Sequence, residues 1–208
     1  MNSTTYWQPE LPLIAILRGI RAEEAIDHVS ALVAAGFDAI EIPLNSPDWQ
    51  TSIDLAVRHF GARAWIGGGT VLNTADVDTL KELNARLMIA PNSHAEVIHR
   101  AVANELIAVP GIATPSEAFA ALAAGAHGLK IFPASTYGPH FVQALRAVLP
   151  PAPLYAVGGI SPDNLADYIA AGCTGAGLGS HLYKPGQPVA RTESMARAFI
   201  QAFQDATK

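Results

Sequence analysis

The sequence predicts a (β/α)8 barrel, and three observations indicate this fold. Short runs rich in Val, Ile, Leu and Ala, without polar alternation, recur eight times along the 208 residues. Helix-like patterns lie between these runs, and "VAAGFDAIEI", "LAAGAHGLKI" and "IAAGCTGAGL" each place a glycine before the next run. A glycine there ends a helix in the left-handed conformation. The chain therefore repeats one unit, and its length is near the lower limit for eight such units.

Each apolar run is interpreted as a parallel strand buried on both faces. In chain order the expected strands are "LPLIAIL" (11–17), "DAIEIPL" (38–44), "AWIGGGTV" (64–71), "RLMIAP" (86–91), "LIAVPG" (106–111), "GLKIFP" (128–133), "LYAVGG" (154–159) and "GAGLGS" (175–180). The expected helices between them include 22–36, 73–84, 93–104, 116–125, 140–149 and 161–172. An open, doubly wound sheet is the structural alternative.

Composition limits the class of protein. No linker, charge block or low-complexity segment divides the chain, so residues 1–208 are predicted to form one domain. The net charge is −5 and the 13 lysines and arginines are scattered, which argues against nucleic-acid or membrane-surface partners. Cys173 is the only cysteine, which excludes an internal disulfide and fits a reducing compartment. Because "MNSTTYWQPE" lacks the basic start of a secretion signal, we expect a cytoplasmic protein.

Lys130 and Glu41 stand inside apolar strands, in "GLKIF" and "AIEIP". The chemistry of a barrel lies at the carboxyl ends of its strands, where both residues fall. One interpretation is a buried ion pair that only balances charge. The other is covalent catalysis, in which a desolvated, neutral lysine attacks a ketone to form a Schiff base and Glu41 moves protons. Four apolar neighbours are expected to keep the lysine neutral: Ile40, Ile42, Ile131 and Phe132.

The ends of the last two strands are rich in glycine. Gly158, Gly159, Gly179 and Ser180 are predicted to form a phosphate cradle, from backbone N–H groups and a helix N-terminus. Tight turns alone are the alternative. A dinucleotide site is a weaker interpretation, because "GAGLGS" lacks the third glycine of that fingerprint.

Arg18 ends the first strand, where its guanidinium can grip a carboxylate with two hydrogen bonds; a surface arginine is the alternative. Thr70, Pro91 and Phe132 occupy the ends of other strands. His94 and His99 are five residues apart and therefore not on one helix face, so no metal site is expected. His181, just after the glycine-rich loop, is the histidine nearest to the predicted site.

The quoted motifs, in this order along essentially the whole chain, resemble the 2-keto-3-deoxy-6-phosphosugar-acid aldolases. The resemblance implies a homotrimeric, cofactor-free class I aldolase on a (β/α)8 barrel. Lys130 would form the Schiff base and Glu41 would be the general acid/base. Arg18 and Thr70 would contact the pyruvate moiety, and the glycine pair and Ser180 the phosphate. The substrate class is a phosphorylated 2-keto-3-deoxy sugar acid.

One feature distinguishes branches of this family. The phosphogluconate-type branch carries an arginine four residues after the glutamate, whereas "EIPLNSP" has Asn45 there. The galactonate-type branch resembles "EIPLNSP", so we expect cleavage of 2-dehydro-3-deoxy-6-phosphogalactonate. One alternative is an aldolase that cleaves the gluconate epimer and 4-hydroxy-2-oxoglutarate. The others are a phosphosugar epimerase or isomerase on the same barrel and a non-catalytic phosphate-ligand binder.

Overall fold

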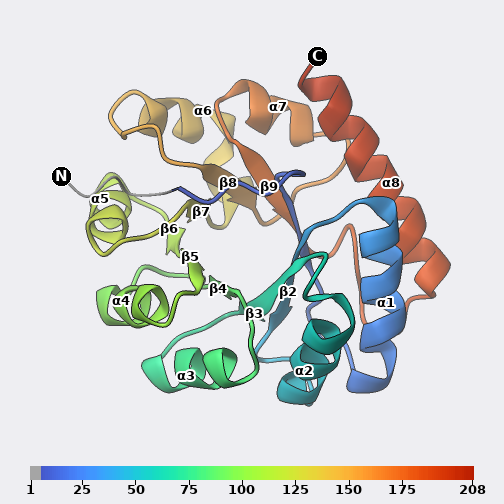
Figure 1. The fold of residues 1–208 in the computed structure, drawn as a ribbon. Helices are drawn as coiled ribbons and strands as arrows, with labels where there is room; N and C mark the ends of the chain where they lie inside the picture. The colour runs from blue at the N-terminus through green and yellow to red at the C-terminus, as the bar shows by residue number, and fades with distance from the viewer. Residues whose placement is uncertain (1–5) are drawn as a thin grey trace.

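The computed structural model describes residues 6–208, and its strands form one parallel sheet that curls into a barrel (Figure 1). The strands are β1 Leu13–Ile16, β2 Ala39–Pro43, β3 Trp65–Gly69, β4 Leu87–Ile89, β5 Ile107–Val109, β6 Gly111–Ile112, β7 Leu129–Ile131, β8 Leu154–Val157 and β9 Gly175–Leu178. Their order in the sheet is β5-β4-β3-β2-β1-β9-β8-β7-β6. The predicted (β/α)8 barrel is confirmed. The expectation that the chain lacks a secretion signal rests partly on residues 1–5, which lie outside the described residues.

Nine strands correspond to eight units because the fifth expected strand is divided. β5 pairs with β4, whereas β6 pairs with β7, and Pro110 separates the two pieces. Proline has no N–H to donate to a ladder, so it interrupts the pairing at this point. Its carbonyl still accepts a hydrogen bond from the Lys130 N–H at 2.9 Å, which keeps the two sides of the barrel together.

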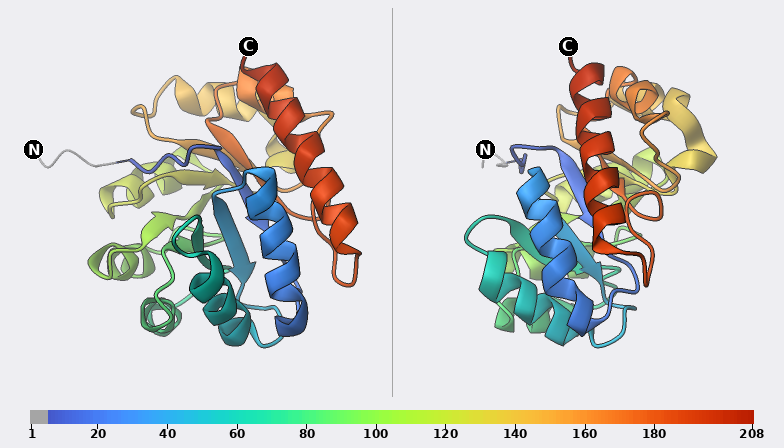
Figure 2. Two further views of the ribbon diagram at one scale, coloured as in Figure 1. Left: turned by 45° about the vertical axis from the view of Figure 1, so that its right-hand side comes forward. Right: turned by 90° about the vertical axis from the view of Figure 1, so that its right-hand side faces the viewer.

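Helices surround the strands as a ring (Figure 1). They are α1 Ala22–Ala35, α2 Trp49–Phe60, α3 Thr74–Glu82, α4 Ala95–Ala103, α5 Pro115–Ala123, α6 Ala134–Arg146, α7 Leu165–Ala170 and α8 Val189–Ala206. α1 and α8 run side by side, which brings the two ends of the chain's helical ring into contact (Figure 2). Gly36, Gly125 and Gly172 have φ of 113°, 95° and 109°, so the predicted left-handed helix ends are confirmed.

Two separate cores hold the barrel together. The larger core lies between the strands and the helices, and it includes Ile40, Ile42 and Ile131. The smaller core fills the barrel interior, and its members are Trp7, Ile14, Ile16, Ala39, Leu87, Ile89, Val109, Tyr155 and Val157, with Trp65, Ile107 and Phe132 packed against them. Successive strand residues point to opposite faces. The expectation that Ile40, Ile42 and Ile131 surround the lysine was therefore wrong, since they face the helices.

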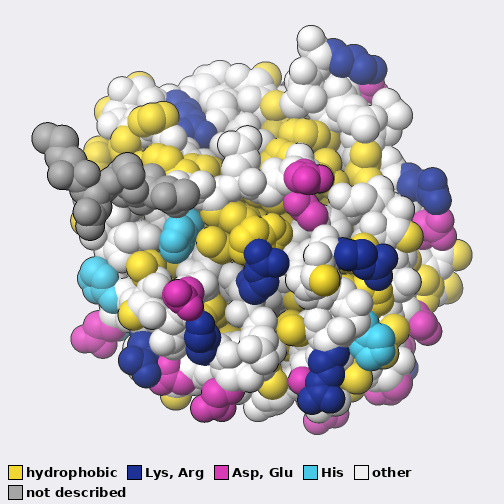
Figure 3. Space-filling view, in the orientation of Figure 1, with side chains coloured by type: hydrophobic (Ala, Val, Ile, Leu, Met, Phe, Trp, Pro, Cys, Tyr) yellow, Lys and Arg dark blue, Asp and Glu magenta, His cyan; other side chains and the backbone are white. Residues whose placement is uncertain are grey.

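On the face seen in Figure 3, basic and acidic side chains are interspersed and form no patch of a single charge. Such mixing agrees with the scattered charges of the sequence. Among residues 6–208, no helix has the length and apolar character needed to cross a membrane.

Candidate active site

A cavity of about 570 Å³ opens at the carboxyl ends of the strands. Nine of the ten predicted site residues line it: Arg18, Thr70, Pro91, Lys130, Phe132, Gly158, Gly159, Gly179 and Ser180. The tenth, Glu41, is not a lining residue and is only 1% exposed. The barrel thus brings together residues that are spread over most of the sequence.

Lys130 lies on β7 and its side chain is only 4% exposed. Burial holds the pKa of the Lys130 ammonium below its usual value; the Glu41 carboxylate opposes this shift and the Arg18 charge adds to it. The amine Nζ lies 5.0 Å from the centre of the Phe132 ring. Phe132 is thus the one expected apolar neighbour that does face the lysine, and interior residues such as Ile16 and Val157 line the same cavity. This environment favours a neutral amine.

Glu41 lies on β2, and Gly69 at the end of β3 makes room for it. A Cβ atom on Gly69 would overlap Oε2 of the Glu41 carboxylate, so a larger residue here would force the Glu41 side chain to move. Within the described residues, this Oε2 atom is buried and has no hydrogen-bond partner. Burial raises the pKa of Glu41, while the charges of Lys130 and Arg18 oppose the shift. A buried carboxyl group therefore keeps its proton to higher pH than an exposed one.

The interpretation of Lys130 and Glu41 as a neutralising ion pair finds no support in the geometry. Among residues 6–208, no ion pair or hydrogen bond joins the two side chains. Buried charges that serve only structure are normally paired and hydrogen-bonded. Two buried, unpaired groups with pKa values shifted toward neutrality are instead typical of sites that transfer protons.

The loops after β8 and β9, the two strands that follow the Lys130 strand in the sheet, also line the cavity. Within residues 6–208, no hydrogen bond engages the N–H groups of Gly158, Gly159, Gly179 or Ser180. The neighbouring carbonyls are fixed, since Gly158 O accepts from Ser135 N at 3.0 Å and Gly159 O accepts from Asn164 Nδ2 at 2.9 Å. Gly158 and Gly159 have φ of 98° and 77°, a left-handed conformation that favours glycine. Unpaired amides on a fixed loop can bind an anion.

The expected helix N-terminus does not adjoin these amides. α7 begins at Leu165 and α8 at Val189, so both helices start beyond the glycine pair and Ser180. An anion bound here would therefore meet loop amides rather than a helix end.

Several cavity-lining residues were absent from the predicted set. His181, Tyr183, Lys184 and Pro185 belong to the loop between β9 and α8, and they extend the wall beyond Ser180. The sequence carried one clue, because a Pro- and Gly-containing stretch follows the last strand directly. His181 had been noted for its place after the glycine-rich loop.

Other candidate residues lie away from the cavity. His94 and His99 are exposed, and Cys173 is buried, with a thiol pKa raised by burial to about 12. Within residues 6–208, no three His, Cys, Asp or Glu side chains gather as a metal ion would require.

A (β/α)8 barrel with a buried lysine and glutamate at its mouth defines a class of enzymes that act on small molecules. The chain belongs to the KDPG and KHG aldolase family, whose family model matches residues 7–195. It is 54% identical to the 2-dehydro-3-deoxy-6-phosphogalactonate aldolase of Escherichia coli K12, over 97% of this chain and 99% of that protein. A solved structure described as native KDPGal is also 54% identical, with a TM-score of 0.96, covering 97% of this chain and 98% of that one. The KHG/KDPG aldolase of Escherichia coli K12 is 30% identical over 76% of this chain and 75% of that protein.

Proposed function

We propose that this aldolase cleaves 2-dehydro-3-deoxy-6-phosphogalactonate to pyruvate and D-glyceraldehyde 3-phosphate through a Schiff base on Lys130. The observation that carries the chemistry is the buried lysine, which faces the cavity without an ion-pair partner among the described residues. The substrate assignment is supported by 54% identity to an enzyme of that name, against 30% to a KHG/KDPG aldolase.

The reaction begins when the neutral Lys130 amine attacks the C2 ketone, and loss of water leaves an iminium. The iminium is an electron sink, so the C3–C4 bond breaks once the C4 hydroxyl loses its proton. Glyceraldehyde 3-phosphate departs, the enamine is protonated at C3, and hydrolysis releases pyruvate. No step needs a metal or cofactor, because the iminium supplies the polarisation that a Lewis acid would otherwise supply.

Glu41 is the proposed general acid/base. Its raised pKa lets one carboxyl group accept the C4 hydroxyl proton and later return a proton to C3. Because Glu41 does not line the cavity, we propose that a water molecule relays the proton between the carboxyl group and the substrate.

The two ends of the substrate carry negative charge and meet different groups. Arg18 and Thr70 are proposed to bind the carboxylate beside Lys130, with Pro91 and Phe132 forming the walls. The amides of Gly158, Gly159, Gly179 and Ser180, which have no hydrogen-bond partner within residues 6–208, are proposed to bind the phosphate.

The experiment that tests the substrate assignment compares kcat/KM for the two purified C4 epimers in one coupled pyruvate assay. Both epimers share the carboxylate, the ketone and the phosphate, so only the C4 hydroxyl separates them. One poorly paired polar group costs about 1–3 kcal/mol, or roughly 5- to 150-fold. We expect the galactonate epimer to be cleaved at least as well as the gluconate epimer. A clear gluconate preference would overturn the substrate and leave the chemistry standing.

We further propose that residues 1–208 form a single domain that assembles as a cytoplasmic homotrimer serving galactonate degradation. The family resemblance supports the trimer, and among residues 6–208 four large apolar side chains are exposed on the single chain: Leu72, Phe119, Tyr137 and Val148. The mass of the assembly in solution, from light scattering during gel filtration, tests this state.

A further inference from the structure

Arg18 is held by two side chains that follow the next two strands. Its Nη1 donates to Asn45 Oδ1 at 2.7 Å, and its Nη2 donates to Thr70 Oγ1 at 3.3 Å. An arginine only donates, so Asn45 must present its oxygen and not its amide nitrogen. Three N–H groups of the guanidinium remain, enough for a carboxylate to be bound by two hydrogen bonds.

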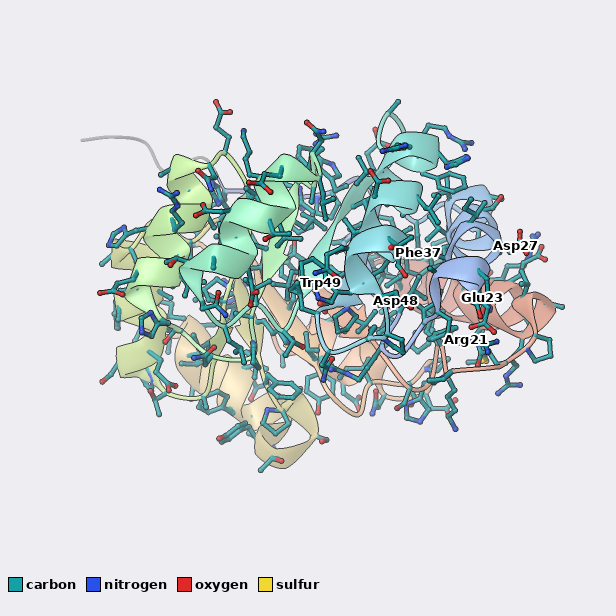
Figure 4. The ribbon with its side chains drawn as sticks, turned by 90° about the horizontal axis from the view of Figure 1, so that it is seen from below. Arg21, Glu23, Asp27, Phe37, Asp48 and Trp49 are labelled. Atoms are coloured by element: carbon teal, nitrogen blue, oxygen red, sulfur yellow. The ribbon has the colours of Figure 1, made fainter. Side chains whose placement is uncertain are left out.

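The loop that carries Asn45 is itself fixed beside Arg18. Ser46 Oγ accepts a hydrogen bond from Gly19 N at 2.9 Å, and Ser46 N donates to Pro43 O at 2.8 Å. Asn45 and Ser46 therefore hydrogen-bond to two consecutive residues after β1, Arg18 and Gly19. The loop ends where α2 begins, at Asp48 and Trp49 (Figure 4). Asn45 is thus held on a fixed loop, although its side chain is exposed.

Thr70 shows that this arrangement has a conformational cost. Its φ is 57°, in the left-handed region that β-branched residues rarely adopt. Such a conformation persists where the surroundings hold it, and it clusters at functional sites. Here it accompanies the contact between Thr70 Oγ1 and the Arg18 guanidinium.

Both partners of Arg18 are neutral. Within residues 6–208, no carboxylate forms an ion pair with this guanidinium. Its positive charge therefore remains available to a ligand in the cavity, which Arg18 lines together with Lys130.

We propose that Asn45 is a positioning residue that fixes the Arg18 guanidinium for the substrate carboxylate while leaving its charge uncancelled. The inference rests on the proposed function, since it takes the carboxylate to be that of the keto acid bound at Lys130. It assigns a role to the residue that stands where the phosphogluconate-type branch carries arginine. A neutral acceptor there orients one arginine, and a second cation is not needed.

The test compares two ketones that differ in one charge. Pyruvate carries a carboxylate and methyl pyruvate does not, and both can be trapped on an amine by sodium cyanoborohydride. The half-saturating concentration of each ketone is measured by intact mass for the wild-type chain, Asn45→Ala and Asn45→Asp. Asn92→Ala and Asn92→Asp are matched controls, because Asn92 is also exposed just after a strand but is not one of the two side chains that accept from Arg18.

We expect Asn45→Ala to raise the half-saturating concentration of pyruvate roughly 5- to 30-fold, the effect of losing one hydrogen bond to a charged group. Asn45→Asp should raise it at least as much, because the new carboxylate cancels the charge of Arg18. The half-saturating concentration of methyl pyruvate should stay within about twofold of wild type in Asn45→Ala. In the Asn92 variants the half-saturating concentrations of both ketones should stay within the same range.

Unchanged pyruvate trapping in both Asn45 variants would overturn the inference. An equal loss for pyruvate and methyl pyruvate would also overturn it, because that pattern indicates general damage to the site. If the wild-type chain forms no adduct at all, the proposed function fails and the inference fails with it, a result visible before any variant is made.

Discussion

At the amino-terminal end of the barrel interior, aromatic rings pack against one another, whereas at the carboxyl-terminal end two ionisable side chains, Lys130 and Glu41, are buried. Trp7 lies 6.2 Å from Trp65 and 5.9 Å from Tyr155, centre to centre, and the Tyr155 hydroxyl donates to Trp7 O at 3.4 Å. Nearby, the Asp38 carboxylate accepts from Glu10 N at 2.8 Å. Most polar groups at this end are satisfied, although Trp7 Nε1 has no partner among the described residues.

The carboxyl-terminal end contains the opposite combination. Lys130 and Glu41 are buried with shifted pKa values, and the amides of the exposed or half-buried glycine loops have no hydrogen-bond partner within residues 6–208. An unsatisfied buried polar group destabilises a fold by about 1–3 kcal/mol. The comparison teaches that one end of the interior stabilises the barrel, while the other gives up stability for groups that a ligand can engage. Changes at the carboxyl-terminal end should therefore act mainly on catalysis, and changes at the amino-terminal end mainly on stability.

Apart from loss of Lys130 itself, the largest effect is expected from losing the carboxyl group of Glu41. Glu41→Gln should lower turnover by about 10²- to 10⁴-fold while Schiff-base formation persists, because a positioned proton carrier contributes that much. Gly69→Ala should lower turnover by a similar factor, since its Cβ takes the place of Glu41 Oε2. Both values come from kcat in the coupled assay. A change confined to KM would make Glu41 a binding residue.

Gly68→Ala is the matched control for Gly69→Ala. Its Cβ would meet Leu80 at 2.9 Å and Leu44 at 3.0 Å, on the helix side of the sheet. We therefore expect it to lower the free energy of unfolding without lowering kcat of the folded enzyme. A loss of kcat as large as that of Gly69→Ala would show that the effect is not specific to the glutamate.

The next effect concerns the anion cradle. Apart from its chain neighbours, a Cβ on Gly179 would meet no heavy atom of residues 6–208 within 4 Å, so Gly179→Ala should fold normally. It would project into the space that we assign to phosphate, so KM for the phosphorylated substrate should rise roughly 5- to 30-fold. Trapping of pyruvate, which has no phosphate, serves as the internal control. If pyruvate is affected equally, the cradle has been assigned to the wrong part of the ligand.

A smaller effect is a shift in pH dependence. The trapping rate follows the neutral Lys130 amine, whose pKa is lowered by burial, raised by the Glu41 carboxylate and lowered by the Arg18 charge. Removing the anion in Glu41→Gln should lower the pKa of Lys130 and move the acidic limb of the rate–pH profile to lower pH. Removing the cation in Arg18→Met should raise this pKa and move the limb to higher pH. Rate against pH with saturating methyl pyruvate measures both, and shifts of the same sign would contradict the account.

The smallest effect on catalysis is expected at the amino-terminal end. Trp7→Ala removes a buried indole and should lower the free energy of unfolding by about 3–5 kcal/mol. Because Trp7 does not line the cavity, kcat/KM of the folded enzyme should change by less than about twofold. Urea unfolding and the coupled assay give the two numbers. Loss of activity in fully folded protein would show that the two ends are coupled.

The sequence predicted the eight units because hydrophobic runs and helix-ending glycines are local features. It did not predict that Pro110 divides the fifth strand, since the consequence of one missing N–H depends on which neighbours the strand pairs with. The placement of Ile40, Ile42 and Ile131 was wrong because a continuous apolar run does not reveal which face is the interior.

At the site, strand-end positions predicted which residues gather at the mouth, because parallel strands bring their carboxyl ends together. The contact between Arg18 and Asn45 could not be predicted, since the two residues are 27 apart in sequence and meet only through loop geometry. The same holds for Gly69, whose role depends on the direction in which the Glu41 side chain points.

The central claim is that Lys130 forms a Schiff base with the keto acid. Treating the enzyme with pyruvate and borohydride, then mapping the modified peptide, tests this claim most directly, since reduction turns an iminium into a stable amine. We predict irreversible inactivation with the modification on Lys130 alone, and a folded but inactive Lys130→Met variant that takes up no label. Modification of Lys81, Lys184 or Lys208 instead, or no modification at all, would contradict the account.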